Sequence, residues 1–308
     1  MIRLDDLALF VRTAAVGSFS NAAREADLLP AQVSAAIKRL EGELGARLFA
    51  RSTRSLRLTA EGEQYLPYAS EALATLAAGQ SVLRREPEHL NGILQLAAPS
   101  DLGRNVLLPT LSAFRRAHPR LTLRLFLSDQ VTDVFKDPVD VALRYGQPED
   151  ASFVALPLAA ENRRVAVASP DYLRRHGRPT TPAELAGHAC LAFVLHGRVY
   201  DRWAFHPLAG QPQVVAVNSA LMSDDADVVR RWAIAGEGIA YKSWLDVCDD
   251  VQAGRLVTLF GGALGEPVPL NLICPHRGQF SPAVRQLHTM LKQQCDLLLA
   301  ALPKGNAA

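Results

Sequence analysis

Residues 20–44 contain the pattern that most limits how this chain can fold: two short helical segments separated by a tight turn. Ser20 is expected to cap the first segment, NAAREA, and Pro30 stands at the first position of the second, where a helix tolerates proline. Two such helices form a helix-turn-helix. The second is predicted to run from Pro30 to Leu44, with an inward stripe made of Val33, Ile37, Leu40 and Leu44.

The outer surface of the second helix carries small or polar side chains. Ala31, Ala35 and Lys38 point away from the stripe, and Ser34 lies on its flank. Such a surface fits the major groove of DNA, which is about 12 Å wide. A plain three-helix bundle with an alanine-rich surface would show the same pattern, because residues 4–16 are predicted to form a further amphipathic helix. The helices alone leave both interpretations open.

A basic segment follows directly. Residues 45–59, GARLFARSTRSLRLT, contain no acidic residue, and the end of the segment alternates like a half-buried strand. A basic hairpin after a recognition-type helix is a wing, and its arginines suit phosphates or a narrow minor groove. A charge run is usually only a solvated surface, but this location favours DNA. The four arginines are Arg47, Arg51, Arg54 and Arg57.

Thr59 is expected to cap a long helix that ends near Arg85. Its seam residues recur in alternating steps of three and four, which is typical of a coiled coil. A seam of this kind is most simply buried against a second copy of the helix, so a homodimer is expected; packing on its own domain is the alternative. The seam consists of Leu66, Ala69, Leu73, Leu76, Gln80 and Leu83.

Composition sets the wider limits. A chain of 308 residues has room for two domains, and 33 Lys and Arg against 31 Asp and Glu give a net charge of +2, so any basic site must be local. We expect no secretory signal and no membrane-spanning helix, because the apolar runs are too short. The 4 cysteines lack the spacing of metal or redox motifs. These features predict a cytoplasmic protein with reduced thiols, no metal and no cofactor.

From residue 92 onward, strand-like and helical segments alternate, which predicts parallel sheets with helices on their faces. A long amphipathic helix is expected over 282–302. Expected strands are ILQLAAP, LTLRLFLS, DVALRY, RRVAVAS, VVAVNS, GIAYK and VPLNLICP, and expected shorter helices are NVLLPTLSAFRRAH, VTDVFKD, DYLRRHG and DDADVVRRWAIAG.

The segment GSFSNAAREADLLPAQVSAAIKRLEGELGARLFARSTRSLRLTAEG resembles the winged helix-turn-helix of LysR-type transcriptional regulators. Later motifs, including APSDLG, DVALRYG, VASPDYLRRHG and ICPHRG, are similar to the CrgA-like branch of that family. The resemblance implies an α/β protein in three parts: a winged helix-turn-helix DNA-binding domain over 1–58, a linker and dimerisation helix over 59–87, and a periplasmic-binding-protein-like effector domain over 88–308.

The resemblance further implies that the effector domain has two subdomains joined by crossing strands. The first comprises about 92–163 plus 267–300, and the second about 164–266. The partners that it implies are double-stranded DNA, a small-molecule effector, a second copy of the chain in a homodimer or homotetramer, and RNA polymerase; no membrane partner is expected.

DNA contacts carry over from the family position by position, with two departures. The family often has Ser or Thr at Leu29, so the usual cap and phosphate contact are missing here. It often has Arg at Ala35, so a guanine contact is absent there. Specificity is therefore expected to depend more on Ser34, Gln32, Lys38 and DNA shape. The expected contact residues are Pro30, Gln32, Ser34, Ala35, Lys38, Arg51, Arg54 and Arg57.

In open α/β sheets, ligands bind beyond the carboxyl ends of strands. Applied to the predicted strands, this rule selects effector-binding candidates from both subdomains. Each has an ordinary alternative: Arg144 pairs with Asp140, Ser128 caps a helix, or His196 only hydrogen-bonds within a loop. The candidates are Ser100, Asp101, Leu102, Ser128, Arg144, His196, Asn218, Ser219 and Gly236, the last in a loop with Glu237 and Gly238.

Asp101 suggests the class of effector. Relatives commonly have Ser or Thr there, which suits a carboxylate ligand. A carboxylate at this position either pairs with Arg144 or receives an amine or hydroxyl of the ligand. The sequence therefore predicts an effector that is not a plain anion, such as a zwitterion or a hydroxylated aromatic compound.

Four functions are compared. A ligand-responsive regulator would bind dyad-symmetric promoter sites as an oligomer and change DNA bending when its effector binds. An enzyme is not favoured, because G-x-S-x-G, H-E-x-x-H and Walker sequences are missing from the chain. A solute-binding protein would not need the first ninety residues. A constitutive regulator that no longer responds to an effector stays open.

Overall fold

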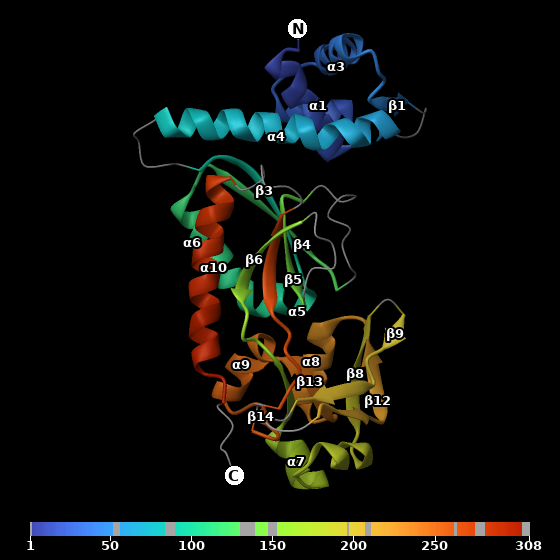
Figure 1. Ribbon diagram of the computed structural model, residues 1–308, viewed down its shortest axis with the longest axis vertical. Coiled ribbons are helices and arrows are strands. Elements are labelled where there is room, and N and C mark those ends of the chain that lie inside the picture. The colour runs from blue at the N-terminus through green and yellow to red at the C-terminus, as the bar shows by residue number, and fades with distance from the viewer. Residues whose placement is uncertain are drawn as a thin grey trace. The chain divides into compact units, whose positions relative to one another are not determined.

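The computed structural model describes residues 2–51, 56–83, 90–129, 139–146, 153–195, 197–206, 211–261, 264–274 and 281–303. The chain divides into two compact units (Figure 1). The N-terminal unit comprises Met1–His89 and His276–Pro282, and the C-terminal unit comprises Leu90–Pro275 and Ala283–Ala308.

The N-terminal unit is a winged helix-turn-helix followed by a long helix. The predicted helices and hairpin are confirmed, but Ser20 does not cap the second helix. Ser18 does so instead, because its side chain accepts a hydrogen bond from the Asn21 amide and the helix already begins at Phe19. The elements are α1 (Leu4–Val16), α2 (Phe19–Glu25), α3 (Pro30–Leu44), β1 (Phe49–Arg51), β2 (Leu56–Leu58) and α4 (Ala60–Leu83).

Aromatic rings form the centre of this unit. The Phe49 ring packs edge-on against Phe10 and Phe19, with ring centroids 5.6 and 5.7 Å apart. The Glu41 carboxylate of α3 accepts hydrogen bonds from the amides of Leu48 and Phe49, at 2.8 and 3.2 Å, which fixes the start of the hairpin against the helix. The wing is thus attached rigidly to α3.

Helix α4 begins as predicted, since the Gly62 amide donates to the Thr59 hydroxyl at 3.0 Å. The first part of its apolar seam packs inside the N-terminal unit, where Ala69 is buried and Leu66 and Leu73 lie against the same core. This part of the seam therefore follows the alternative of packing on its own domain. Leu76, one step further along, is 45% exposed.

The first subdomain of the C-terminal unit contains a five-stranded sheet in the order β4-β3-β5-β15-β6. Strand β3 pairs in parallel with β4 and β5, whereas β15 pairs antiparallel with both of its neighbours. The strands are β3 (Gly92–Ala98), β4 (Leu121–Leu127), β5 (Val141–Tyr145), β6 (Val154–Ala159) and β15 (Leu270–Cys274). The helices are α5 (Ser100–Leu102), the π-helical turn η1 (Gly103–Leu107), α6 (Leu108–Ala117) and α10 (Pro282–Ala300).

The second subdomain contains a sheet in the order β12-β8-β13-β7-β14, in which β7 is antiparallel to both neighbours, and a separate ribbon, β10-β11. The strands are β7 (Arg164–Ala168), β8 (Cys190–Leu195), β9 (Arg198–Val199), β10 (Arg202–Phe205), β11 (Gln213–Ala216), β12 (Ser219–Ser223), β13 (Ile239–Ser243) and β14 (Val257–Thr258). The helices are α7 (Pro170–His176), the 3-10 helix η2 (Pro182–Gly187), α8 (Ala226–Ala235) and α9 (Trp244–Gln252).

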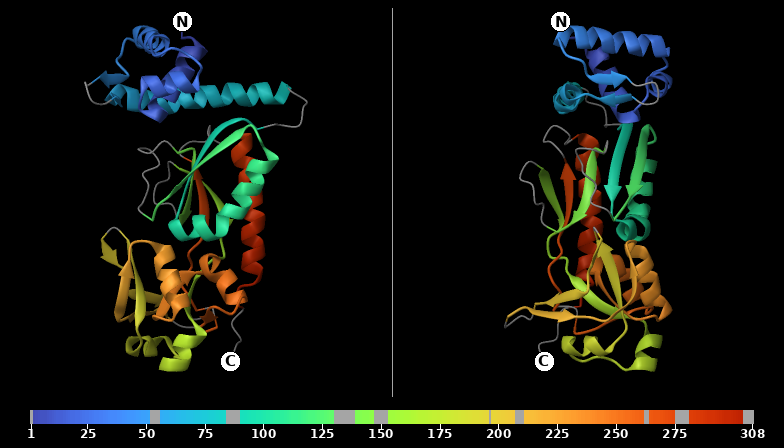
Figure 2. Two further views of the ribbon diagram at one scale, coloured as in Figure 1. Left: turned by 180° about the vertical axis from the view of Figure 1, so that it is seen from behind. Right: turned by 90° about the vertical axis from the view of Figure 1, so that its right-hand side faces the viewer.

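The predicted parallel pairing holds for part of each sheet, and the sheets are mixed because the chain crosses between the subdomains and returns, as the resemblance implied. The outgoing and returning segments pair with each other, with a bridge between Arg163 and Pro267. Buried Asn162 donates to the Val268 carbonyl at 2.8 Å and to the Ser243 hydroxyl at 3.0 Å. Figure 2 shows both crossing segments between the two sheets. A strand that returns this way, β15, runs antiparallel to its neighbours.

Helix α10 contacts both subdomains. In the first, the Gln294 amide group donates to the Val106 carbonyl at 2.6 Å. In the second, the Trp244 indole donates to the Leu298 carbonyl at 2.8 Å. The helix therefore runs along the C-terminal unit and supports the junction from one side (Figure 1).

Candidate functional site

The outer surface of α3 has the composition that the sequence predicts. Val33, Ile37 and Leu40 are buried, whereas Ala35 and Lys38 are exposed. Pro30, Ala31 and Gln32 are also exposed, and Ser34 is half-buried. The helix thus offers short side chains and one ammonium group to a groove.

The start of α3 is capped from inside the helix. The Gln32 side-chain oxygen accepts a hydrogen bond from the Leu29 amide at 2.7 Å, which is one half of a capping box; the other half, a side-chain oxygen at position 29 that would accept from an amide of the first turn, is missing because the residue is Leu. Leu29 itself is 67% exposed at the end of the turn. On the wing, Arg57 of β2 is exposed; Arg54 and the Arg51 side chain lie outside the described residues. These exposed side chains form the candidate DNA interface.

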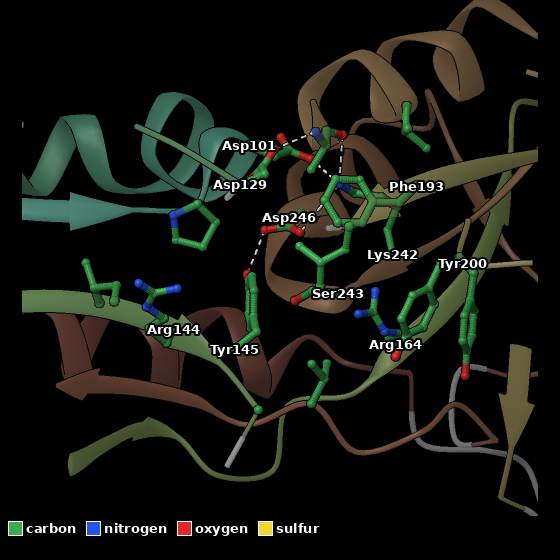
Figure 3. Close-up of a pocket in the computed structure, with 18 of the residues that line it drawn as sticks. Asp101, Asp129, Arg144, Tyr145, Arg164, Phe193, Tyr200, Lys242, Ser243 and Asp246 are labelled. Atoms are coloured by element: carbon green, nitrogen blue, oxygen red, sulfur yellow. Dashed lines mark hydrogen bonds and ion pairs between the residues drawn. The ribbon is translucent and has the colours of Figure 1, made fainter. Parts of the chain in front are cut away.

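A cavity of about 500 Å³ lies between the two subdomains of the C-terminal unit. Figure 3 shows side chains from both subdomains around it. Charged, hydroxyl and aromatic groups all contribute to its walls. The labelled lining residues are Asp101, Asp129, Arg144, Tyr145, Arg164, Phe193, Tyr200, Lys242, Ser243 and Asp246.

Lys242 of β13 supplies a buried positive charge at this cavity. Its ammonium nitrogen lies 2.6 Å from an Asp101 oxygen and 3.6 Å from an Asp246 oxygen. Burial disfavours the charged ammonium, but the two carboxylates outweigh burial and raise the pKa of Lys242 above its ordinary value. Lys242 is therefore a structural cation at the floor of the cavity.

Asp246 links Lys242 to Tyr145. The Tyr145 hydroxyl donates to Asp246 at 2.7 Å. Burial raises the pKa of Asp246 to about 6, although Lys242 opposes the shift. Burial and the neighbouring Asp246 charge also raise the pKa of Tyr145 well above its ordinary value. Tyr145 thus stays protonated as a hydrogen-bond donor, and this bond joins the first subdomain to the second.

Arg230 of α8 forms ion pairs with three carboxylates next to the cavity. Its guanidinium nitrogens lie 2.9 Å from Asp101, 3.0 Å from Asp227 and 2.6 Å from Asp250. Burial lowers the pKa of Arg230, but Asp101 and the other carboxylates outweigh this and raise it overall. Because Asp101 belongs to the first subdomain and Arg230 to the second, this ion pair also connects the two subdomains.

Other lining residues combine charge with aromatic rings. The Arg164 guanidinium lies 2.7 Å from Glu266, and its centre lies 5.2 Å from the centroid of the Tyr200 ring. Phe193 and Tyr200 both line the cavity (Figure 3). A planar ligand would find an aromatic surface here.

The predicted effector residues fall into four groups. Asp101, Ser128 and Arg144 line the cavity, whereas Ser100 and Leu102 are buried beside it without lining it. His196 lies outside the described residues. The remaining three lie elsewhere: Asn218, Ser219 and Gly236.

Asn218 and Ser219 lie at the wrong end of a strand. The sequence predicts one strand over 214–219, but β11 ends at Ala216 and a new strand begins at Ser219. Ser219 pairs with Cys190, the first residue of parallel β8, whereas the cavity lies near the last residues of β8. The cleft end of β12 is therefore its carboxyl end, which leads into α8.

Gly236 ends α8 in a left-handed conformation, with φ of 83°. Its carbonyl accepts a hydrogen bond from Arg175 at 2.8 Å. The first turn of the same helix lines the cavity through Ala226 and Val229. Gly236 is at the other end of α8 and has a structural role as its C-cap.

Of the two alternatives for Asp101, pairing with Arg144 is wrong. The carboxylate is 1% exposed and pairs with Arg230 and Lys242, not with Arg144. Its charge is therefore compensated within the protein. Sequence reasoning missed Lys242, although a lysine in the otherwise apolar strand segment GIAYK indicates a buried charge, and Asp246 follows it four residues later.

All four cysteines are buried. Burial raises the pKa of Cys190, Cys274 and Cys295 to about 12, and that of Cys248 to about 11. The thiolate, which is the reactive form, is thus disfavoured at each.

Among the described residues, no group of three or more His, Cys, Asp and Glu is arranged to hold a metal ion. In the same part of the chain, no helix combines the length and apolar character needed to cross a membrane.

Comparisons with known proteins identify the families of both domains. The bacterial regulatory helix-turn-helix protein, lysR family, matches residues 4–63, and the LysR substrate binding domain matches residues 87–296. The transcriptional regulator CrgA of Neisseria meningitidis serogroup C is 34% identical over 270 residues, which cover 87% of this chain and 89% of the relative.

Two solved structures extend the comparison. The CrgA structure from Neisseria meningitidis has a TM-score of 0.56 and 28% identity, and the alignment covers 96% of this chain and 97% of that one. A full-length OxyR variant from Pseudomonas aeruginosa has a TM-score of 0.70 at 17% identity, with 100% of this chain and 99% of that one covered. The second similarity concerns the fold alone.

Proposed function

The chain belongs to the LysR family of transcriptional regulators, with a DNA-binding and an effector-binding domain, and on that premise we propose how it acts. An oligomer binds dyad-symmetric promoter sites, and an effector in the cleft changes the bend of the DNA. The observation that carries the proposal is one chain with two sites: an exposed helix surface suited to a major groove and a polar cavity between two subdomains.

Helix α3 enters the major groove with Ala35 and Lys38 toward the bases. Pro30, Gln32 and Ser34 border this contact, and Arg51, Arg54 and Arg57 of the wing hold phosphates or the minor groove. The attachment of the wing to α3 through Glu41 supports simultaneous contacts with both grooves.

The oligomer forms through α4 and is a homodimer or homotetramer. Exposed Leu76 on α4 supports pairing beyond the part of the seam that is buried within the N-terminal unit. Two copies would place two α3 helices in successive major grooves. The complex acts in the cytoplasm, where bacterial DNA lies, and RNA polymerase is its partner there.

The effector is a zwitterion or a hydroxylated aromatic compound. The support comes from the cavity walls, which offer both signs of charge, as Arg164 and Asp246 illustrate, and the aromatic rings of Phe193 and Tyr200. Arg144 and Ser128 supply further polar contacts. The ligand bridges the two subdomains and stabilises one closure state, and so shifts the population of DNA-bound forms.

Footprinting of the purified protein on the DNA upstream of its own gene tests the proposal. We expect a protected, dyad-symmetric site that changes when a correct metabolite is added, and an affinity that falls steeply with rising salt. Absence of any duplex binding at low salt would overturn it. A footprint that no metabolite changes would instead support a constitutive regulator.

A further inference from the structure

Asp129 connects the two subdomains across the cleft. The residue follows β4 of the first subdomain, and its Oδ1 accepts a hydrogen bond from the Ser100 amide at 2.8 Å. Its Oδ2 accepts one from the Ser100 hydroxyl and another, at 2.8 Å, from the amide of Ala226 in α8 of the second subdomain. One carboxylate is therefore bound by donors from both sides of the cleft.

A second carboxylate lies beside the same hydroxyl. Asp225 Oδ1 is 3.1 Å from the Ser100 oxygen, but a hydroxyl has one proton to donate. Asp225 has other donors, since Arg104 lies 2.9 Å away and the amides of its own helix bond to it. Because Asp225 has these donors, the Ser100 proton is assigned to Asp129.

Ser100 is 3% exposed, so its hydroxyl has no access to bulk water. A buried hydroxyl and two amides that converge on one point would be costly without an acceptor. Asp129 lines the cavity, and Figure 3 shows it beside Asp101. The acceptor is thus a side chain at the place where a ligand carboxylate would bridge the subdomains.

We propose that Asp129 is an internal carboxylate that closes the cleft in the absence of an effector. It keeps the donors of Ser100 and Ala226 satisfied, so an acid from solution must compete with a tethered group of the same chemistry. Effector recognition is then left to the Arg164 and Tyr200 side of the cavity. The inference rests on the proposed effector-binding function of this cleft.

Replacement of Asp129 by alanine, followed by rescue with free acetate, tests the proposal. We expect Asp129→Ala to lower the melting temperature by about 3 °C or more, because charge-assisted hydrogen bonds across the cleft are lost. Sodium acetate at about 100 mM should restore much of the loss, relative to sodium chloride at the same ionic strength. The wild-type protein should not respond to acetate.

Asp171→Ala is the matched control. Asp171 lies in the first turn of α7, is half-exposed, and pairs with Arg174 and Arg175 away from the cavity. Acetate should not stabilise this variant. Isothermal titration of acetate into Asp129→Ala should show heat of binding that is missing in the wild-type protein.

Equal acetate stabilisation of the wild-type protein and Asp129→Ala would overturn the proposal, as would a variant with an unchanged melting temperature and no acetate binding. If the alanine variant does not fold, Asp129→Asn supplies a separate test. Its single amide oxygen can accept only part of the three hydrogen bonds and its side chain fills the acetate site, so we expect a lowered melting temperature that acetate does not restore; a melting temperature equal to that of the wild-type protein would overturn the proposal. Gel-shift assays of the wild-type protein on its footprinted DNA test the proposed function separately, since their failure would not alter the acetate result.

Discussion

The two units bury different chemistry. The N-terminal unit packs aromatic rings around Phe10 and Phe49. The C-terminal unit buries Asp101, Arg230 and Lys242 at the junction of its subdomains, in addition to its apolar clusters. Among its described residues, the N-terminal unit buries one charge, Asp6, which pairs with Arg39 of α3. The aromatic core and the Glu41 hydrogen bonds give α3 and the wing a single geometry, which suits a rigid groove.

Buried charges at a junction have a different consequence. An ion pair gains little net stability after desolvation, but the loss of one partner is costly, because the other charge stays buried. The junction therefore favours one arrangement of the subdomains strongly over neighbouring ones. We infer that the C-terminal unit can respond to a small polar ligand because its arrangement depends on a few polar contacts.

Replacement of Arg230 should give the largest effect. Arg230→Met leaves the buried carboxylates of Asp101 and Asp250 with fewer partners, and we expect a loss of about 3–5 kcal/mol in the free energy of unfolding. Urea unfolding followed by circular dichroism measures it. Arg231→Met is the control, because Arg231 is 66% exposed where it pairs with Asp227. Its loss should stay below about 1 kcal/mol. Equal losses would contradict the special role of the junction.

Replacement of Lys38 tests the DNA-binding surface of the N-terminal unit. Lys38→Ala should leave folding intact but weaken operator binding by about 1–3 kcal/mol if the ammonium contacts a base. A phosphate contact would instead reduce the slope of log affinity against log salt by about 1. Fluorescence anisotropy over a salt series distinguishes the two. The control is Lys292→Ala, which removes one charge from α10. The same weakening in both variants would show that only net charge matters.

Asp140 tests whether burial of charge also limits stability away from the junction. Burial raises its pKa to about 6, although its bond from the Gln95 amide at 2.7 Å opposes the shift. The folded state therefore binds the proton more tightly than the unfolded state, so stability falls as the pH rises from about 4 to about 6 and stays reduced above that.

Asp140→Asn keeps an oxygen that can accept the Gln95 bond without charge. We expect it to raise the free energy of unfolding at pH 8 by about 1–2 kcal/mol and to flatten the decline between pH 4 and 6. Urea midpoints of both proteins at several pH values check this. A variant that is less stable than the wild-type protein at pH 8 would refute it.

The same contrast explains what the sequence could predict. In the N-terminal unit, the surface of α3 follows from a local pattern: the stripe of Val33, Ile37 and Leu40 repeats at helical spacing, so the outward position of Lys38 follows directly. The departures there, such as Ser18 in place of Ser20 as the cap, are shifts of a few residues. Periodicity thus predicted the surface as well as the fold.

The cleft depends on pairings between distant residues. Asp101 meets Arg230 and Lys242, which lie more than a hundred residues later, and no local pattern specifies that partnership. The misplacement of Asn218 and Ser219 has the same origin. Which end of β12 faces the cleft is known only from the pairing of this strand with β8. The rule about carboxyl ends of strands was sound, but it needed the strand order.

The smallest expected effect is a loss of DNA affinity that depends on Leu29 of the N-terminal unit. Its side chain is 67% exposed at the start of α3, close in sequence to exposed Ala31. Thymine presents a methyl group in the major groove, and an apolar side chain can contact it. Replacing operator thymines by deoxyuridine removes that methyl and should weaken wild-type binding by about fourfold, the equivalent of one buried methylene.

Leu29→Ser should bind both duplexes equally, because its shorter polar side chain has no apolar contact to lose. Fluorescence anisotropy with duplexes from the footprinted site, substituted one thymine at a time, identifies the base involved. Wild-type binding that is indifferent to every substitution would place Leu29 away from the bases. The N-terminal unit would then read its operator through Lys38, its polar neighbours and DNA shape, with no apolar contact to thymine.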